Sequence, residues 1–206
     1  SGLFLALTGA RLNAADARFV GFADRLLLSS QREQLVEQLM QADWSGEADA
    51  EVMRVLKNLE AEAELELESA VANNFDVLQS LTDHHSTAEI VDAILAHDCG
   101  DDAWLSRAQK SLRLGSPLAA LLIHRQLQVS KHMSLGQVFQ SELILSVQCC
   151  LQQEFFEGVR ALLVDKDGQP KWRYQSLREV DPSLVHACFV APWPQHPLAK
   201  AFGNTL

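Results

Sequence analysis

Hydrophobic residues recur at helical spacing along most of the chain, whereas strict alternation of hydrophobic and polar residues is nearly absent. Positions three and four apart lie on one face of an α-helix, so each stripe predicts a helix with one face toward a core. Three such stripes comprise Leu35, Val36, Leu39 and Met40; Ile90, Val91, Ile94 and Leu95; and Leu118, Leu121, Leu122, Arg125 and Val129. The pattern predicts a mainly α-helical protein with about eight to ten helices and short loops.

One helix is expected to be longer than the others, from Ser134 to Gly158. Its predicted core positions are Leu135, Val138, Phe139, Leu143, Leu151 and Phe155. Residues 22–28, with the sequence FADRLLL, also suit a short β-strand. The expected secondary structure is therefore helical with at most one short strand.

Helix starts are marked by short polar residues that are followed, three positions later, by an acidic residue or a glutamine. In such a capping box the two side chains satisfy free backbone N–H groups at the start of the helix. The pairs are Asn13 with Asp16, Ser30 with Glu33, Ser86 with Glu89, and Ser134 with Gln137. Ser116 and Asp181 each precede a proline, which predicts a capping side chain and a proline in the first helical turn.

Glycine and proline mark the expected boundaries between elements. The stretch 44–46, Trp-Ser-Gly, separates an N-terminal segment from the middle of the chain, and residues 191–206 carry three prolines. A proline-rich end favours an extended, mobile tail. We therefore expect three parts, residues 1–43, 44–180 and 181–206, the last with a short helix and the extended tail.

Length and charge narrow the class of protein. The chain has 206 residues, of which 48% are hydrophobic, and its net charge is −10. This length suits one sizeable domain or two small ones. A strongly acidic surface argues against a nucleic-acid partner, because phosphate backbones require a basic footprint. A small anionic ligand is still compatible, because a local basic pocket can lie on an acidic protein.

The four cysteines, Cys99, Cys149, Cys150 and Cys188, have no spacing typical of a zinc site or a disulfide framework. We expect reduced thiols in a cytoplasmic protein. Cys149 and Cys150 have no neighbouring histidine, which favours buried, unreactive thiols over a nucleophile. No hydrophobic run reaches the roughly 20 residues of a membrane span, so no membrane partner is expected.

The chain begins with serine and glycine and enters an apolar segment at residues 3–7 without a capping residue. An apolar face so close to a chain start needs a partner, which leads us to expect a piece of a longer protein. The alternative is a short natural start with a removed tag. If the first interpretation holds, the piece alone exposes apolar faces and self-associates.

Two histidine-containing stretches offer His84, His85, His97 and Cys99 as candidate metal ligands. Neither stretch has the i, i+4 histidine pair or the CxxC spacing of a zinc site, and polar residues at helix ends are typical caps. We therefore expect no metal site.

The acidic run at residues 60–68 alternates carboxylates with small or apolar residues. Paired carboxylates suit a metal or acid–base site, but Glu60, Glu64 and Glu68 lie about one helical turn apart. Like charges at this spacing repel mildly and favour water. The run is interpreted as a solvated helix face.

The segment from Glu154 onward combines cations with aromatic residues. Its members are Arg160, Lys166, Lys171, Trp172, Arg173 and Tyr174. Cations beside an aromatic ring suit a nucleotide phosphate and an adenine. A structural interpretation is open as well: Lys166 complements the helix dipole, Asp165 pairs with a nearby cation, and Trp172 packs the chain back onto the helix.

Residues 155–172, FFEGVRALLVDKDGQPKW, resemble the C-terminal signature of 3-hydroxyisobutyryl-CoA hydrolases, a branch of the crotonase (enoyl-CoA hydratase/isomerase) superfamily. Three further stretches agree with this family in the same order. They are residues 4–27, residues 86–94 together with 111–127, and residues 134–150. The resemblance covers about residues 3–180.

The resemblance implies a mechanism and a fold. Family members hold the carbonyl of an acyl-CoA thioester in an oxyanion hole and hydrolyse the thioester with acidic side chains. In the family these groups belong to a β-rich spiral core that precedes the part matched here, and no GGG-type oxyanion segment occurs in this chain. The expected fold is therefore the helical C-terminal region of a crotonase-like protein without its core, and no catalytic residue is assigned.

By resemblance, Lys166, Arg160 and Trp172 are the candidate CoA-binding residues. The parent protein is expected to hydrolyse 3-hydroxyisobutyryl-CoA in valine catabolism, with the missing core as partner and no cofactor beyond the CoA of its substrate. Two alternatives stay open. One is a hydratase or isomerase on the same fold, and the other is a non-enzymatic helical interaction module.

Overall fold

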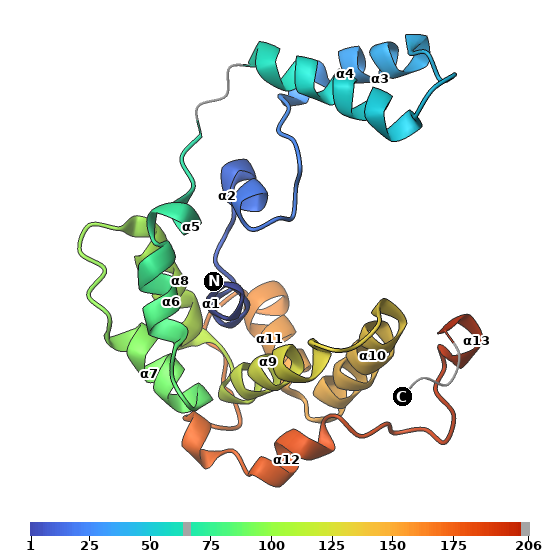
Figure 1. The fold of residues 1–206 in the computed structure, drawn as a ribbon. Helices are drawn as coiled ribbons and strands as arrows, with labels where there is room; N and C mark the ends of the chain where they lie inside the picture. Colours follow the sequence, from blue (N-terminus) through green and yellow to red (C-terminus); the bar gives the residue numbers. More distant parts are fainter. Residues whose placement is uncertain (64–66, 203–206) are drawn as a thin grey trace. The chain divides into compact units, whose positions relative to one another are not determined.

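A computed structural model describes residues 1–63 and 67–202 of the chain, and no β-strand occurs among them. The chain divides into two compact units (Figure 1). The first comprises Ser1–Ala10 and Gln79–Leu206, and the second comprises Arg11–Leu78. The predicted mainly helical fold is confirmed. The stretch at residues 44–46, expected to separate an N-terminal segment from the middle of the chain, joins two helices within the second unit.

The second unit contains α2 (Ala14–Phe19), η1 (Ser29–Gln31), α3 (Arg32–Gln41), α4 (Ala48–Ala63) and α5 (Ala70–Asn73), and its boundary falls within α6 (Phe75–Thr82). Helix α2 packs against α5, and α3 packs against α4. The short strand considered for residues 22–28 is absent. The backbone N–H of Leu26 instead donates to the Glu60 carboxylate at 3.0 Å, so this stretch bonds to a side chain and not to another strand.

Glu60 is not the solvated charge that its spacing suggested. Its carboxylate lies 3.0 Å from the guanidinium of Arg25 and 3.2 Å from that of Arg18. The hydrogen bond from Leu26 and these two cations lower the pKa of Glu60. One acidic side chain thus joins α2, through Arg18, and the irregular segment, through Arg25 and Leu26, to α4. Glu64, in the same predicted face, lies outside the described residues.

The start of α2 shows the predicted capping box between Asn13 and Asp16. Asp16 is buried, and its carboxylate also accepts from Val71 N–H at 2.9 Å and from the Ser69 hydroxyl at 2.7 Å. Burial raises the pKa of Asp16, but the hydrogen bonds from Val71, Asn13 and Ser69 together lower it. The cap therefore also holds α5 against α2.

The capping box predicted at Ser30 and Glu33 does not form. Helix α3 begins at Arg32, after the 3₁₀ turn η1, and has no side-chain cap. Gln31 instead accepts from the backbone N–H of Leu28 at 2.9 Å. The hydrophobic stripe predicted on α3 is also largely unburied, since Met40 is 81% exposed.

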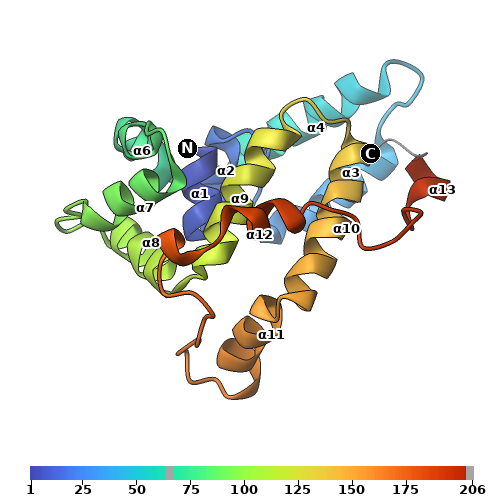
Figure 2. The same cartoon turned by 90° about the horizontal axis from the view of Figure 1, so that it is seen from below.

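The first unit contains α1 (Gly2–Thr8), α7 (Thr87–Ala96), α8 (Ala103–Leu114), α9 (Pro117–Ser130), α10 (Leu135–Leu151), α11 (Glu154–Val159), η2 (Arg160–Val164), η3 (Leu177–Glu179), α12 (Pro182–Ala187) and α13 (Ala199–Phe202). Helices α1 and α7 each pack against both α8 and α9, and α12 packs on α9. Figure 2 shows α11 following α10, with α12 lying across α9.

The core of this unit uses the two predicted stripes on α7 and α9. Ile90 and Ile94 are buried on α7, and Leu118 and Leu122 are buried on α9. Phe4 of α1 stacks on Trp104 of α8 with ring centroids 5.8 Å apart. The apolar start of the chain is thus part of a core, not an exposed face.

The predicted helix starts of this unit are confirmed at four positions. Ser86 and Ser134 each form a capping box, and Ser116 and Asp181 cap helices that begin with a proline. None of the helices within the described part of the chain is long and apolar enough to cross a bilayer.

The long helix predicted from Ser134 to Gly158 is broken. Gln153 adopts a left-handed backbone with φ 64°, which separates α10 from α11. Several predicted core positions are exposed, among them Leu135 at 70% and Leu151 at 62%. The buried side of α10 carries Gln140 and Ile144 instead. The helix is apolar on more than one side, and several of its large apolar side chains are exposed.

Candidate functional site

The turn after η2 ends the helix by backbone geometry. The N–H of Gly168 donates to the carbonyl of Ala161 at 3.0 Å, and the N–H of Asp165 donates to that of Arg160 at 2.8 Å. Lys166 and Gly168 both lie in the left-handed region, with φ 56° and φ 62°. This conformation suits glycine at a helix end but costs about 1–2 kcal/mol for a residue with a Cβ. The turn therefore holds Lys166 in a strained conformation.

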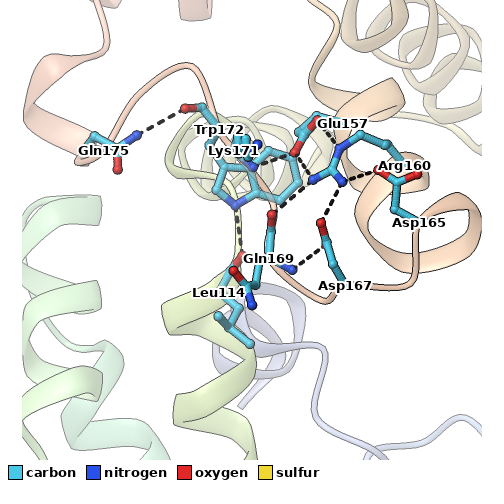
Figure 3. A network of polar contacts seen from close by, with 9 residues as sticks. All are labelled: Leu114, Glu157, Arg160, Asp165, Asp167, Gln169, Lys171, Trp172 and Gln175. Atoms are coloured by element: carbon cyan, nitrogen blue, oxygen red, sulfur yellow. Dashed lines mark hydrogen bonds and ion pairs between the residues drawn. The ribbon is translucent and has the colours of Figure 1, made fainter.

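Arg160 joins the two sides of this turn (Figure 3). Its Nε and Nη2 donate to both oxygens of Glu157 at 2.9 and 2.7 Å. Its Nη1 donates to Asp165 at 2.6 Å and to Asp167 at 2.8 Å. The second N–H of Nη2 donates to the carbonyl of Gln169 at 3.0 Å. These bonds occupy all five N–H donors of the guanidinium.

The hydrogen bonds of this network also shift the pKa values of its charged groups. Hydrogen bonds from Arg160, and then from the backbone N–H of Lys171, lower the pKa of Glu157 to about 2. Glu157 in turn raises the pKa of Arg160, and Arg160 lowers that of Asp167. The pair between Arg160 and Glu157 is therefore charged at neutral pH.

Trp172 joins the segment that follows the turn to the C-terminal end of α8. Its indole N–H donates to the carbonyl of Leu114 at 2.9 Å. A Cβ placed on Gly158 would lie 3.4 Å from the indole ring, so the ring packs closely against α11. The structural interpretation of Trp172, and the pairing of Asp165 with a cation, are both confirmed.

An apolar groove of about 600 Å³ lies beside this turn. Its lining includes Leu114, Ala119, Val159, Leu162, Leu163 and Trp172. Ser116 and Glu154 are the polar exceptions: both are buried, and the Ser116 hydroxyl donates to the Glu154 carboxylate. Glu154 also accepts from the backbone N–H of Arg173 at 3.4 Å. An apolar groove with few polar groups is typical of a ligand or partner surface.

Glu154 was not identified from the sequence. Its only signal is an acidic residue at a helix start, directly before two phenylalanines. Such a residue usually caps its own helix, whereas Glu154 accepts from Ser116, the cap of α9. The contact spans 38 residues, which no local pattern indicates.

The three candidate CoA-binding residues lie on one stretch of chain around the turn. Arg160 is bound within the turn, and Trp172 forms part of the groove. Lys166 is exposed, and no ion pair is found for it within the described ranges. The CoA-binding role of the three residues stays a prediction. A phosphate contact by Arg160 would require the loss of one of its five hydrogen bonds.

The remaining candidates from the sequence have no reactive geometry. Burial raises the pKa of Cys149 to about 11 and also raises that of Cys188, so both thiols are protonated at neutral pH. No group of three or more histidine, cysteine and acidic residues that could hold a metal occurs in residues 1–63 and 67–202.

The family of the chain follows from its similarity to known proteins. The sequence profile of the enoyl-CoA hydratase/isomerase family matches residues 1–189. The chain belongs to this family.

The similar proteins include hydrolases and hydratases. The mitochondrial 3-hydroxyisobutyryl-CoA hydrolase of Danio rerio is 33% identical over 190 residues, which are 91% of this chain and 48% of the relative. An enoyl-CoA hydratase from Rhodobacter sphaeroides 2.4.1 has a similar solved structure, with a TM-score of 0.75 and 28% identity over 95% of this chain and 52% of that one.

A carnitinyl-CoA dehydratase from Mycobacterium thermoresistibile also has a TM-score of 0.75, with 26% identity over 94% of this chain and 52% of its own. The chain thus spans about half the length of the relatives that it matches. The helical architecture described above is shared with solved members of the crotonase superfamily.

Proposed function

We propose that the chain is the C-terminal helical part of an acyl-CoA thioester hydrolase that acts on 3-hydroxyisobutyryl-CoA. The observation that carries the proposal is the 33% identity to a relative of that name over 91% of the chain. The signature at residues 155–172 supports it, because it forms the turn and the wall of the groove. The catalytic groups of the parent protein would then lie in the half that the chain does not span.

The exposed apolar side chains of the first unit support a missing partner. We call the following set the α10–η2 surface: Leu135, Phe139, Leu151, Phe155, Phe156, Leu162, Leu163 and Val164, all more than a third exposed. Soluble proteins rarely leave so many large apolar side chains in contact with water without a partner. In the parent protein the rest of the chain would cover part of this surface.

The alternative of a hydratase on the same fold is favoured by a separate observation. Two solved structures with a TM-score of 0.75 bear the names of an enoyl-CoA hydratase and a carnitinyl-CoA dehydratase. The two reactions differ in their products. A hydrolase releases free CoA, whereas a hydratase adds water to an enoyl-CoA and leaves the thioester intact.

The experiment is chromatographic detection of CoA released from 3-hydroxyisobutyryl-CoA. It compares this chain with a longer protein that also contains the residues encoded upstream of Ser1. We expect no release by the chain alone and release by the longer protein. Turnover of 2-enoyl-CoA without free CoA would support the hydratase. Release by the chain alone would refute the assignment of catalysis to the missing half. A thiol dye is unsuitable, because the chain has four cysteines.

The role in valine catabolism and the cytoplasmic location are parts of the same proposal. The Danio rerio relative above carries the word mitochondrial in its name. Fractionation of cells with an antibody against the chain would decide between these locations.

A further inference from the structure

An arginine can serve an anionic ligand in two ways: it can bind the ligand directly, or it can hold the segment that binds it. A binding arginine keeps donors free, because a phosphate needs two parallel N–H groups. Arg160 has none free, since Glu157, Asp165, Asp167 and the Gln169 carbonyl accept from all five. Its role is therefore different from that of an exposed cation.

The bonds of Arg160 connect three separate backbone positions of the turn. Glu157 lies on α11, Asp165 follows η2, and Asp167 and Gln169 lie beyond the left-handed Lys166. A strained residue persists only where its surroundings hold it. Glu157 also accepts from the backbone N–H of Lys171 at 2.5 Å, so the clamp reaches past both sides of Lys166.

Lys166 is the exposed cation at the centre of this clamp. Flexible lysine side chains on a mobile turn lose much conformational entropy when they bind, whereas a fixed backbone reduces that cost. The ion pairs of Arg160, together with the hydrogen bonds to the Gln169 carbonyl and from the Lys171 N–H, would supply such a fixed backbone. In this arrangement Arg160 holds the backbone of the turn, whereas the exposed side chain of Lys166 is left to contact a ligand.

We propose that Arg160 is a positioning residue that fixes the turn at residues 165–169, so that Lys166 meets a phosphate of the CoA moiety. The identity of the ligand rests on the proposed function, whereas the clamp formed by Arg160 does not depend on it. It assigns to Arg160 a role different from direct CoA binding.

The chain contains a matched control for this clamp. Arg54 donates from Nε and Nη2 to both oxygens of Glu51 at 2.8 and 2.6 Å, three residues earlier on a helix, as Arg160 does with Glu157. No bond from Arg54 to a following turn is found among the described residues. Comparing the same substitution at the two sites isolates the bonds that only Arg160 makes.

The first measurement is hydrogen–deuterium exchange of the chain itself, with Arg160→Lys and Arg54→Lys as variants. Lysine keeps the charge but loses the fork of donors. We expect the hydrogen-bonded amides of the turn to exchange about tenfold faster or more in Arg160→Lys, the effect of losing one charge-assisted hydrogen bond. These amides belong to Asp165, Gly168, Gln169 and Lys171. Arg54→Lys should leave these amides unchanged. Equal exchange in Arg160→Lys and the wild type would overturn the inference.

The second measurement uses the longer protein and its kinetic constants. We expect Arg160→Lys and Lys166→Gln each to raise KM for the acyl-CoA about tenfold, with kcat nearly unchanged, because binding energy far from the reacting bond is lost equally in the ground and transition states. The double variant should have the same KM as Lys166→Gln, since a clamp has nothing to position once Lys166 is gone. Additive effects would overturn the inference and make Arg160 an independent ligand contact.

Calorimetric titration of the wild-type longer protein with CoA separates the two proposals. A wild type that binds no CoA would refute the proposed function and, with it, the ligand of Lys166. The exchange comparison would still decide whether Arg160 holds the turn.

Discussion

Two groups of helices within the first unit have similar hydrophobic patterns and opposite environments. On α7 and α9 the centres of the predicted stripes are buried, with Ile94 fully enclosed, although Arg125 of the α9 stripe is exposed. On the α10–η2 surface, side chains of the same kind are exposed, as Leu162 at 70% and Leu163 at 62% show. The pattern is equally helical in both regions. A hydrophobic stripe therefore predicts that a helix face packs against a partner, but it does not predict that the partner lies within the same chain.

The largest expected effect separates the two regions by stability. Ile94→Ala should lower the free energy of unfolding by about 2–5 kcal/mol, because it leaves a cavity in a packed core. Leu163→Ala, on the α10–η2 surface, should change it by no more than about 0.5 kcal/mol. Urea unfolding followed by circular dichroism at low protein concentration measures both. Similar losses for the two variants would mean that Leu163 is packed in solution, and the comparison would fail.

The next prediction concerns association. The chain alone should self-associate through the α10–η2 surface, and Leu151→Gln combined with Leu163→Gln should weaken this association. Burial of one leucine contributes about 1.5–3 kcal/mol, so each substitution should raise the dissociation constant roughly tenfold or more. Sedimentation velocity measures the shift.

The control for association is Phe22→Gln, which changes a side chain that is 78% exposed in the second unit. It should leave the association unchanged. A wild-type chain that stays monomeric at all concentrations would contradict the prediction.

A smaller effect is expected where the two regions meet. The Ser116 hydroxyl accepts from the N–H of Ala119 at 3.1 Å, as the cap of α9, and donates to the buried Glu154 of α11. Ser116→Ala should therefore cost about 1–3 kcal/mol, because it leaves a buried acceptor short of a donor. Ser134→Ala, which removes an exposed cap alone, should cost about 1 kcal/mol. Equal costs for the two variants would show that the contact with Glu154 adds no stability.

The smallest expected effect is the loss, at low pH, of the hydrogen bonds that Glu157 accepts in the turn after η2. The folded pKa of Glu157 lies at about 2, below its ordinary value of 4.5. Its contribution is therefore complete above the ordinary value and is lost as the pH falls through the folded pKa. The nuclear magnetic resonance signal of the Trp172 indole N–H should move only as the pH approaches 2.

Glu157→Gln should place that signal at its shifted position already at neutral pH. A wild-type transition near the ordinary pKa of a glutamate would show that the clamp is open in solution.

Much of the local structure could be predicted from the sequence. The caps at Asn13, Ser86 and Ser134 formed as expected, because the side chains of a capping box lie within one turn of each other. The pair Ser30 and Glu33 has the same spacing but forms no box, because the helix there begins only at Arg32. The break at Gln153 could not be predicted, since a left-handed glutamine has no local signal. The interpretation of Lys166 as a complement to the helix dipole placed it at a helix end, and the structure has a turn there in which Gly168 adopts a positive φ.

The candidate site was located by the sequence, but the roles within it were not. The cations near Trp172 suggested one anion-binding cluster. The structure shows that Arg160 is engaged by three acidic side chains, whereas Lys166 is exposed. Glu60 changed in the same way, from a presumed solvated charge to a residue with two arginine partners. The arginine partners of Glu60 lie 42 and 35 residues away, whereas the acidic partners of Arg160 lie within seven residues, in a turn whose geometry the spacing alone did not reveal.

The helical class, most helix starts and the family resemblance follow from the sequence alone. These features depend on interactions within a few residues or on the order of motifs along the chain. Only the tertiary structure decided which hydrophobic faces are buried, which cations are bound within the fold, and where the long helix breaks. The physical reason is that burial and ion pairing depend on what lies opposite a side chain, and a repeating pattern along one helix carries no information about its neighbour.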